Sequence, residues 1–360
     1  MHQISVAIIG AGQAGLSAAY FLQRAGMRAW EDYVVLDGSP APGGAWQFRW
    51  PSLTLETVNG VHDLPGMPFR DSLDADTDPA HVPASTAVPQ YYGRYEEHFS
   101  LPVRRPGRVT VVCDRDRDGR YRVEAEQGDV YARALINCTG TWEHPFVPTY
   151  PGMSTFTGRQ LHTKDFSTAD EFRGQHVVVV GGGISAVQIL DEISQVTTTT
   201  WVTRREPVFA EGEFTPEDGR AAVARVEDRV RRGLPPGSVV SVTGLLLTPS
   251  LSAARDRGDL GRHPMFSKVT PDGVAWDDGR TVAADVILWA TGFRSALDHL
   301  APLRLRGPGG GITMTGAAAT QVAGRPTVHL IGYGPSASTI GANRAGRSAV
   351  RELRQELDQT

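Results

Sequence analysis

Cysteine is scarce in this chain, whose 360 residues include only Cys113 and Cys138. Two cysteines that lie 25 positions apart exclude a disulfide framework and a C-x-x-C dithiol. This usage is typical of a reducing compartment, so we expect a cytoplasmic protein. The first ten residues lack a basic segment and lead directly into glycines, and we interpret them as a strand rather than a signal peptide.

The sequence also lacks a long hydrophobic run and an excess of positive charge. No apolar stretch approaches the ~20 residues that a membrane-spanning helix needs, so we expect no membrane partner. Lys and Arg total 36 against 40 Asp and Glu, and the net charge of −4 gives a nucleic-acid partner no electrostatic support. No group of His, Cys and Asp has the spacing of metal ligands, and no G-x-S-x-G nucleophile motif occurs. Hydrophobic residues make up 40% of the chain, enough for one large domain or two smaller ones.

Residues 4–37 follow a strand, glycine loop, helix and strand pattern. We predict strands over 4–9 and 33–36 and a helix over 16–26 that ends at a glycine. The loop carries G-x-G-x-x-G, whose glycines allow a tight turn, close approach of a pyrophosphate and close helix–strand packing. Asp37 lies 27 residues after Gly10, somewhat beyond the ~20 expected of a ribose-binding carboxylate. The predicted dinucleotide site consists of Gly10, Ala11, Gly12, Gln13, Ala14, Gly15 and Asp37.

The same pattern returns over residues 177–205. A predicted strand over 177–180 leads into a second glycine loop, a helix over 187–196 and a strand over 199–203 that ends in two arginines instead of an acid. Guanidinium groups pair with a 2′-phosphate, which a carboxylate would repel. We therefore predict FAD at the first site and NADPH at the second, with NADH possible if the arginines are merely solvated. The second site consists of Gly181, Gly183, Ile184, Ser185, Arg204 and Arg205.

The two copies predict an α/β fold with two Rossmann-like dinucleotide-binding domains. We place a discontinuous FAD-binding domain at 1–150 and 293–360, and an inserted NAD(P)H-binding domain at 151–292. Residues 108–112, 121–125 and 130–137 are predicted as antiparallel and edge strands. The charged stretch at about 212–262 is interpreted as a helical excursion from the second domain. Strands over 284–290 and 327–331 and a helix over 342–357 complete the pattern.

Further segments carry a family resemblance. They are G-G-A-W at 43–46, N-C-T-G-T-W at 137–142, F-x-G-x-x-x-H-x-x-x-F at 156–166 and L-W-A-T-G-F at 288–293. Together with the two glycine loops, they make the chain resemble the flavin-containing monooxygenases over essentially its whole length, and most closely their short bacterial members. The resemblance implies further cofactor-binding residues, namely Gly44, Ala45, Trp46, Thr139, Gly140, Thr291 and Gly292.

The resemblance implies an NADPH-using, FAD-dependent monooxygenase, in which reduced flavin and O2 form a C4a-hydroperoxyflavin that oxygenates a small-molecule sulfide or amine. Baeyer–Villiger relatives carry Trp-Pro where this chain has Phe166 and Ser167, which favours heteroatom oxygenation and leaves ketone oxygenation open. The alternatives are an NAD(P)H-dependent flavin reductase or oxidase that delivers electrons to a separate acceptor, and a nucleotide-binding sensor. A homodimer is possible.

Asn59 is the catalytic candidate that the resemblance implies, with its amide donating a hydrogen bond to the flavin peroxide. Asn59 and Gly60 also fit a turn in which the amide satisfies local backbone. His162 fits either a positioning group where the domains connect or a buried structural histidine. Reductases with two similar nucleotide sites need a cysteine pair near the flavin, and Cys113 falls in a predicted hairpin far from Cys138 in sequence.

Overall fold

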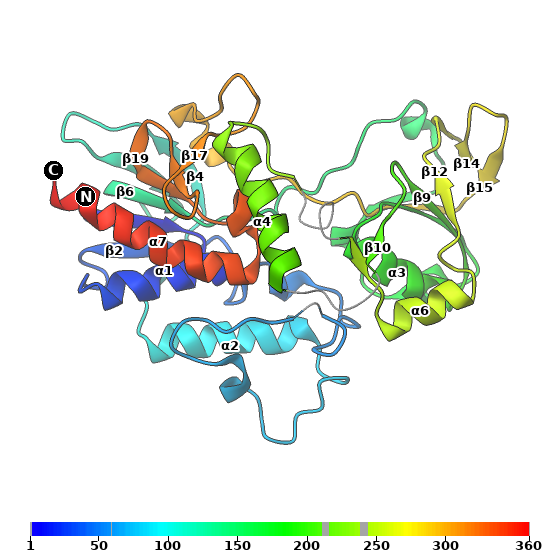
Figure 1. Cartoon of the computed structure of the whole chain (residues 1–360), viewed down its shortest axis with the longest axis horizontal. Coiled ribbons are helices and arrows are strands. Elements are labelled where there is room, and N and C mark those ends of the chain that lie inside the picture. Colours follow the sequence, from blue (N-terminus) through cyan, green and yellow to red (C-terminus); the bar gives the residue numbers. More distant parts are fainter. Residues whose placement is uncertain (1, 59, 211–215, 238–243, 360) are drawn as a thin grey trace. The chain divides into compact units, whose positions relative to one another are not determined.

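The computed structural model describes residues 2–58, 60–210, 216–237 and 244–359 (Figure 1). The chain divides into two compact units. Unit 1 comprises Met1–Glu143, Val223–Gly237 and Ser295–Thr360. Unit 2 comprises His144–Ala222 and Ser238–Arg294. The stretch at about 212–262 is thus divided between the units, because residues 223–237 cluster with unit 1.

Unit 1 is built on a nine-stranded mixed sheet with the order β17-β18-β19-β6-β1-β2-β3, to which β4 and β5 are added beside β6. Strands β1, β2, β6 and β19 are parallel to one another. Its strands are β1 His2–Ile9, β2 Tyr33–Leu36, β3 Val103–Arg104, β4 Val109–Cys113, β5 Tyr121–Ala125, β6 Val130–Asn137, β17 Met314–Thr315, β18 Gln321–Val322 and β19 Arg325–Leu330. Its helices are α1 Gln13–Arg24, α2 Ala84–His98 and α7 Thr339–Asp358, while α4 Pro216–Arg231 crosses the boundary between the units.

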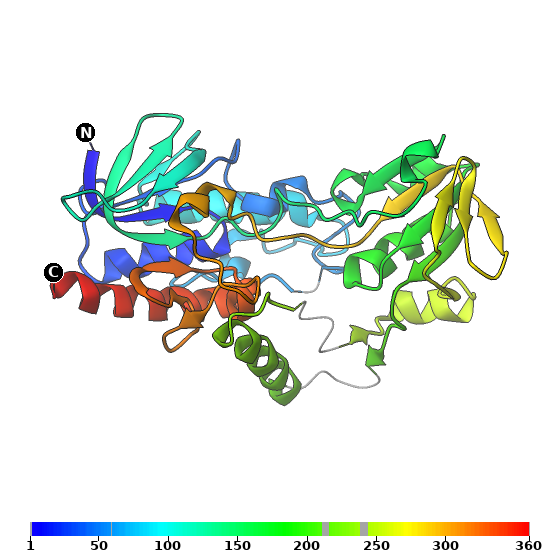
Figure 2. The same ribbon diagram turned by 90° about the horizontal axis from the view of Figure 1, so that it is seen from above.

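Strand β1 is buried on both faces, as expected for a central parallel strand. Val6 and Ile8 belong to the core under α1, α2 and α7, whereas Ala7 and Ile9 belong to the core on the other face of the sheet. Successive side chains of a strand point to opposite faces, so this apolar run supplies both cores. Helices α1 and α7 lie side by side on one face (Figures 1 and 2).

Unit 2 is built on a five-stranded parallel sheet with the order β12-β9-β8-β16-β7, accompanied by a three-stranded antiparallel sheet and the β10–β11 pair. Its strands are β7 Arg159–His162, β8 His176–Val180, β9 Thr198–Thr203, β10 Phe209–Ala210, β11 Leu245–Leu246, β12 Arg262–Pro264, β13 Lys268–Thr270, β14 Gly273–Ala275, β15 Thr281–Ala283 and β16 Val286–Trp289. Its helices are α3 Ile184–Ser194 and α6 Pro249–Asp256.

The fold class predicted from the sequence is confirmed, because β1–α1–β2 and β8–α3–β9 are both present with parallel strands. Helices α1 and α3 begin three residues earlier than predicted, at Gln13 and Ile184. The reason is that the last position of each glycine motif, Gly15 or Ala186, lies inside the first turn of the helix. Among the described residues, no helix combines the length and apolar character needed to cross a membrane.

Candidate functional site

The three glycines of the first loop have different reasons to lack a side chain. A Cβ on Gly10, whose φ is +98°, would lie 2.7 Å from the carbonyl oxygen of Cys138. A Cβ on Gly15 would lie 1.8 Å from the carbonyl oxygen of Gly10. A Cβ on Gly12 would meet no atom within 4 Å. Packing therefore explains Gly10 and Gly15, whereas the open space beside Gly12 fits a ligand that approaches the backbone.

The start of α1 is suited to an anionic group. No side chain caps the helix at Gly12, and the first turn contains no acidic residue. The first N–H groups of a helix have no partner within the helix, and they form the positive end of its dipole. This N-terminus can therefore accept a pyrophosphate. The predicted cofactor-binding residues Ala11, Gln13 and Ala14 lie at it.

Two of the segments assigned by resemblance lie against the first glycine loop. Gly44 of the G-G-A-W segment begins the 3₁₀ helix Gly44–Phe48, and a Cβ there would lie 3.2 Å from the Cα of Gly12. The residues after β6 also lie against the loop, since a Cβ on Gly10 would lie 3.3 Å from the backbone nitrogen of Thr139. Gly140 has a φ of +62° and open space where a side chain would be.

Gln13 connects the loop to three other parts of unit 1. Tyr92 of α2 donates to Oε1 of Gln13 at 2.6 Å, and Nε2 of Gln13 donates to Oδ1 of Asn343 in α7 at 3.0 Å. Nδ2 of Asn343 donates to the carbonyl of Asp63 at 2.6 Å. The catalytic candidate Asn59 lies outside the described residues, and Asp63 is four positions after it. The N-terminal part of α7 and the 60–63 segment are thus held at the glycine loop.

Asp37 follows β2 and is nearly buried, with a side chain 6% exposed. Arg105, which the sequence reasoning missed, donates from Nε to Oδ2 of Asp37 at 2.9 Å. The two Nη groups of Arg105 donate to the two oxygens of Glu96, each at 2.9 Å. Burial raises the pKa of Glu96, although the hydrogen bond from Arg105 opposes this shift. The contacts of Arg105 with Asp37 go to Oδ2, so Oδ1 is the oxygen that can accept from a ribose hydroxyl.

Arg49 is a second cation that the sequence reasoning missed. Its guanidinium lies 4.7 Å from the ring centroid of Trp142 and 5.9 Å from that of Trp46. Burial lowers the pKa of Arg49, and no acidic side chain among the described residues forms an ion pair with it. A partly buried charge without a counter-ion is unfavourable, so an anionic ligand group would stabilise it. The sequence offered one indication of this arginine, namely its position three residues after Trp46 of the G-G-A-W segment.

The second glycine loop repeats the contrast seen in the first. A Cβ on Gly181 would lie 2.1 Å from the carbonyl oxygen of Ala290, whereas a Cβ on Gly183 would meet nothing within 4 Å. Ile184 and Ser185 form the first turn of α3, which has no side-chain cap and no acid in that turn. The loop of unit 2 therefore has the same open approach to a helix N-terminus as the loop of unit 1.

Arg204 and Arg205 directly follow β9 beside the second glycine loop. A Cβ on Gly182 would lie 3.6 Å from both Thr203 and Pro207, which bracket the two arginines. Both arginines are exposed. Arg262 of β12 joins them, since its Nε donates to Oγ1 of Thr203 at 2.7 Å. Sequence reasoning missed Arg262 because β12 is only three residues long and carries no periodicity.

Thr291 and Gly292 follow β16 and bond within unit 2. Oγ1 of Thr291 donates to the carbonyl of Phe146, whose N–H donates to the carbonyl of Gly292 at 2.9 Å. His162 also bonds to this carbonyl, with its Nε2 at 3.0 Å. Nδ1 of His162 accepts from the N–H of Lys164, so Nε2 carries the proton, and burial lowers the pKa of the ring. These contacts give His162 a structural role in this segment.

Comparisons with known proteins identify the family. Residues 7–218 match the family model described as pyridine nucleotide-disulphide oxidoreductase. A flavin-containing monooxygenase from Stenotrophomonas maltophilia is 37% identical, with a TM-score of 0.82 and coverage of 99% of this chain and 100% of that chain. The chain belongs to the flavin-containing monooxygenases. The family resemblance predicted from the sequence is confirmed.

More distant relatives of this flavin-containing monooxygenase include two classes of named oxygenase. Flavin-containing monooxygenase FMO GS-OX-like 2 of Arabidopsis thaliana is 26% identical, over 80% of this chain and 60% of its own length. A Baeyer–Villiger monooxygenase of Streptomyces coelicolor is 27% identical, over 65% of this chain and 43% of its own length. The protein is thus a monooxygenase and an oxidoreductase that uses a flavin and a pyridine nucleotide. The open spaces at Gly12 and Gly183 fit these two groups.

Proposed function

We propose that the protein is an FAD-dependent monooxygenase that uses NADPH and oxygenates a sulfide or amine. The observation that carries the proposal is the pair of glycine loops, in which Gly12 and Gly183 adjoin open space while Gly10 and Gly181 are fixed by packing. In this proposal unit 1 holds FAD at residues 10–15, 44–46 and 139–140, with Oδ1 of Asp37 accepting from its ribose.

The coenzyme preference rests on the charges that follow β9. Arg204 and Arg205 are exposed and adjoin the second glycine loop, and Arg262 is hydrogen-bonded to Thr203 beside them. Guanidinium groups bind a phosphate through paired N–H donors, so this set favours the 2′-phosphate of NADPH over the ribose hydroxyl of NADH. Residues 181–185 would hold the pyrophosphate, and Thr291 and Gly292 complete the proposed site.

The cofactor supplies the oxidising group, and the protein residues bind and orient it. When bound, the flavin would supply the activation of O2 that a soft nucleophile such as a sulfide or amine requires. Asn59 is the proposed hydrogen-bond donor to this group, and the Gln13–Asn343–Asp63 contacts hold the segment that follows it. A preorganised donor in a site that excludes water is worth more than the same donor in water.

Two alternatives depend on particular residues. The Baeyer–Villiger relative supports ketone oxygenation as a second candidate, whereas Phe166 and Ser167 in place of Trp-Pro favour a heteroatom. The disulphide chemistry named by the family model lacks support here, because Cys138 is buried and its burial raises the pKa of the thiol. Sγ of Cys113 instead contacts the carboxylate of Glu124 at 3.7 Å.

The test is anaerobic reduction of the FAD-loaded protein by NADPH, followed by mixing with O2 and spectral recording, with and without a thioether. The proposal predicts a slowly decaying peroxyflavin absorbance that the thioether shortens, together with the sulfoxide as product. Immediate return of oxidised flavin with hydrogen peroxide alone would instead indicate the reductase or oxidase. Lactone or ester from a ketone, without sulfoxide from the thioether, would indicate Baeyer–Villiger chemistry. The cytoplasmic location and the homodimer stay predictions.

A further inference from the structure

An open groove lies along α1 and α7 in unit 1. The two helices run side by side in both views (Figures 1 and 2). Ala317 and Ala318, which lie between β17 and β18, also line the groove. Its volume is about 750 Å³, within the roughly 300–1,000 Å³ of sites that take small molecules. None of the residues assigned above to FAD or NADPH lines it.

Arginine dominates the lining of this α1–α7 groove. Four arginines of α7 and one in the last turn of α1 line it, namely Arg344, Arg347, Arg351, Arg354 and Arg24. The successive spacings of three, four and three residues put the four on one face of α7, over a length of about 15 Å at the usual helical rise. All five are exposed, and no ion pair of any of them occurs in the described part of the chain. Asp358 is the acid of the lining.

The row of four arginines on one face of α7 destabilises that helix through repulsion between like charges. Arg347 and Arg351 are four residues apart, and like charges at that spacing destabilise a helix. The nearby acid Glu352 is half-buried, and its Oε1 accepts from the N–H of Ala317 at 2.9 Å and from Oγ of Ser348 at 3.0 Å rather than from an arginine. The chain as a whole has a net charge of −4, so the concentration of positive charge is local. A bound anion would offset the repulsion between these arginines.

The shape and chemistry of the groove select among anions. Guanidinium groups present planar pairs of N–H donors that match phosphate oxygens. Between the arginines, Phe21, Ala318 and Val350 provide a less polar floor. A concave site of this volume suits a small molecule better than a flat bilayer or a long nucleic-acid strand. We propose that the α1–α7 groove binds a phosphorylated small molecule of nucleotide size, with its phosphates on the arginines and its less polar part on the floor.

The test is calorimetric titration of the flavin-loaded protein with ATP and with tripolyphosphate, at low and at high salt. We expect saturable binding that weakens with salt, and tighter binding of ATP because of the floor. Arg347→Gln and Arg351→Gln should each weaken the binding of ATP by about tenfold, which is equivalent to about 1.4 kcal/mol. The double variant should weaken ATP binding by more. ATP should also increase the hydrogen-exchange protection of α1 and α7. This test does not require turnover, so its result is independent of the proposed monooxygenase reaction.

Matched variants distinguish ATP binding at the α1–α7 groove from ATP binding at the glycine loops and from nonspecific electrostatic attraction. Arg117→Gln removes an exposed arginine of the β4–β5 turn in the same unit and should leave ATP binding unchanged, as should Arg204→Gln. The proposal is wrong if neither probe binds, if tripolyphosphate binds as tightly as ATP, or if the double variant binds ATP as the unchanged protein does. Arginine-dependent binding to anionic vesicles without binding of ATP would also overturn it, and would assign the groove to a membrane surface.

Discussion

At the scale of single residues, Arg105 joins Asp37 to Glu96 in a nearly buried set of charges. The side chains of the three are 13%, 6% and 12% exposed, respectively. Removing one partner of a buried pair leaves an uncompensated charge, which costs about 3–5 kcal/mol. We therefore expect Arg105→Met to lower the free energy of unfolding by about this amount, measured by urea denaturation. It should also weaken FAD binding, because Asp37 loses its orientation.

The matched control is Arg28→Met. Arg28 pairs with Glu31 and Asp32, but its side chain is 65% exposed. Exposed pairs contribute ~0–1 kcal/mol, so this variant should unfold nearly as the unchanged protein does. Equal effects of the two substitutions would contradict the structural role given to Arg105.

Arg49 should bind an anionic group of the flavin nucleotide. Hydrogen bonds to charged groups contribute about 1.5–3 kcal/mol, so Arg49→Gln should weaken FAD binding by roughly ten- to a hundredfold. Titration of the apoprotein, followed by quenching of flavin fluorescence, measures this. Arg49→Lys should restore part of the affinity, and the exposed Arg70→Gln should have no effect. FAD binding that is unchanged in Arg49→Gln would leave this cation without a function.

His329 should make stability depend on pH. The ring is fully buried, its Nδ1 contacts Oγ1 of Thr320 at 3.1 Å, and burial lowers its pKa to about 4. The unfolded chain takes up the proton at the ordinary value near 6.5, so stability falls as pH decreases from 6.5 towards 4. Between about pH 7.5 and pH 5 the loss should be about 2 kcal/mol.

His329→Gln removes the titrating group, and its free energy of unfolding should lose this part of the pH dependence. Urea denaturation at both pH values measures the difference. His81, whose side chain is 83% exposed, provides the control, and His81→Gln should keep the slope of the unchanged protein. A slope that persists in His329→Gln would show that another group causes it.

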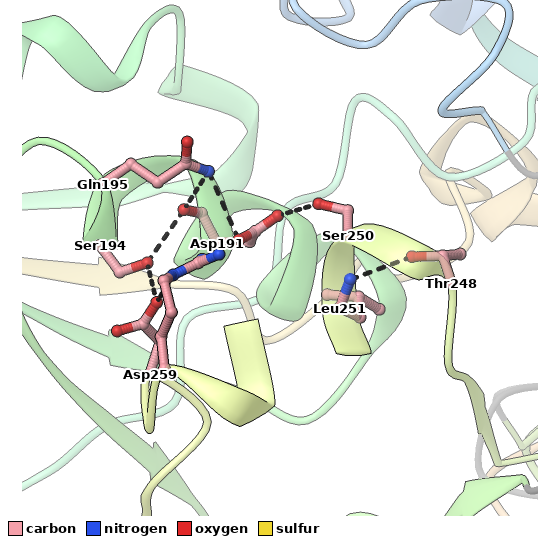
Figure 3. A network of polar contacts seen from close by, with 8 residues as sticks. Asp191, Ser194, Gln195, Thr248, Ser250, Leu251 and Asp259 are labelled. Atoms are coloured by element: carbon pink, nitrogen blue, oxygen red, sulfur yellow. Dashed lines mark hydrogen bonds and ion pairs between the residues drawn. The ribbon is translucent and has the colours of Figure 1, made fainter. Parts of the chain in front are cut away.

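At the scale of elements, α6 is attached to α3 by polar contacts (Figure 3). Asp191 of α3 accepts from Oγ of Ser250 and, at 2.7 Å, from Nη2 of Arg257. Oγ of Ser194 donates to Oδ2 of Asp259 at 3.1 Å. Asp191→Ala would remove the acceptor of Oγ of Ser250 and of Nη2 of Arg257, and it should destabilise unit 2 by about 1–3 kcal/mol. We expect the hydrogen-exchange protection of α6 to fall.

The exposed Asp256 of the same helix supplies the comparison for α6. Asp256→Asn removes a carboxylate from α6 without removing a contact to α3, so the hydrogen-exchange protection of α6 should be unchanged. Loss of protection in both variants, or in neither, would refute the attachment through Asp191.

The elements that sequence reasoning identified are those with a strong local pattern. The strands β1, β2, β8 and β9 are short apolar runs next to glycine or charge, and each was predicted to within a residue or two. Glycine spacing identified both loops, because only glycine fits at Gly10 and Gly181. Strand β12 was missed because its pairing with β9 is a long-range contact that three residues do not encode.

At the scale of the whole molecule, the sequence predicted more about cofactors than about substrate. The two glycine loops and the segments around Gly44 and Gly140 depend on backbone geometry, which leaves a pattern of glycines. Arg49 and Arg105 could not be found in this way, since their importance arises from Trp142 and Asp37, respectively, which are remote in sequence from them. A substrate site has no comparable pattern, and Asn59 lies outside the described residues.

The central claim is that each glycine loop holds its own dinucleotide, and reciprocal valine substitutions test it most directly. A side chain at Gly12 or Gly183 enters open space, so neither Gly12→Val nor Gly183→Val should unfold the protein. The measurement is bound flavin, by visible absorbance, alongside NADPH binding. We predict that Gly12→Val loses flavin and still binds NADPH, whereas Gly183→Val keeps flavin and loses NADPH. Full flavin content in Gly12→Val, or undiminished NADPH binding in Gly183→Val, would contradict the claim.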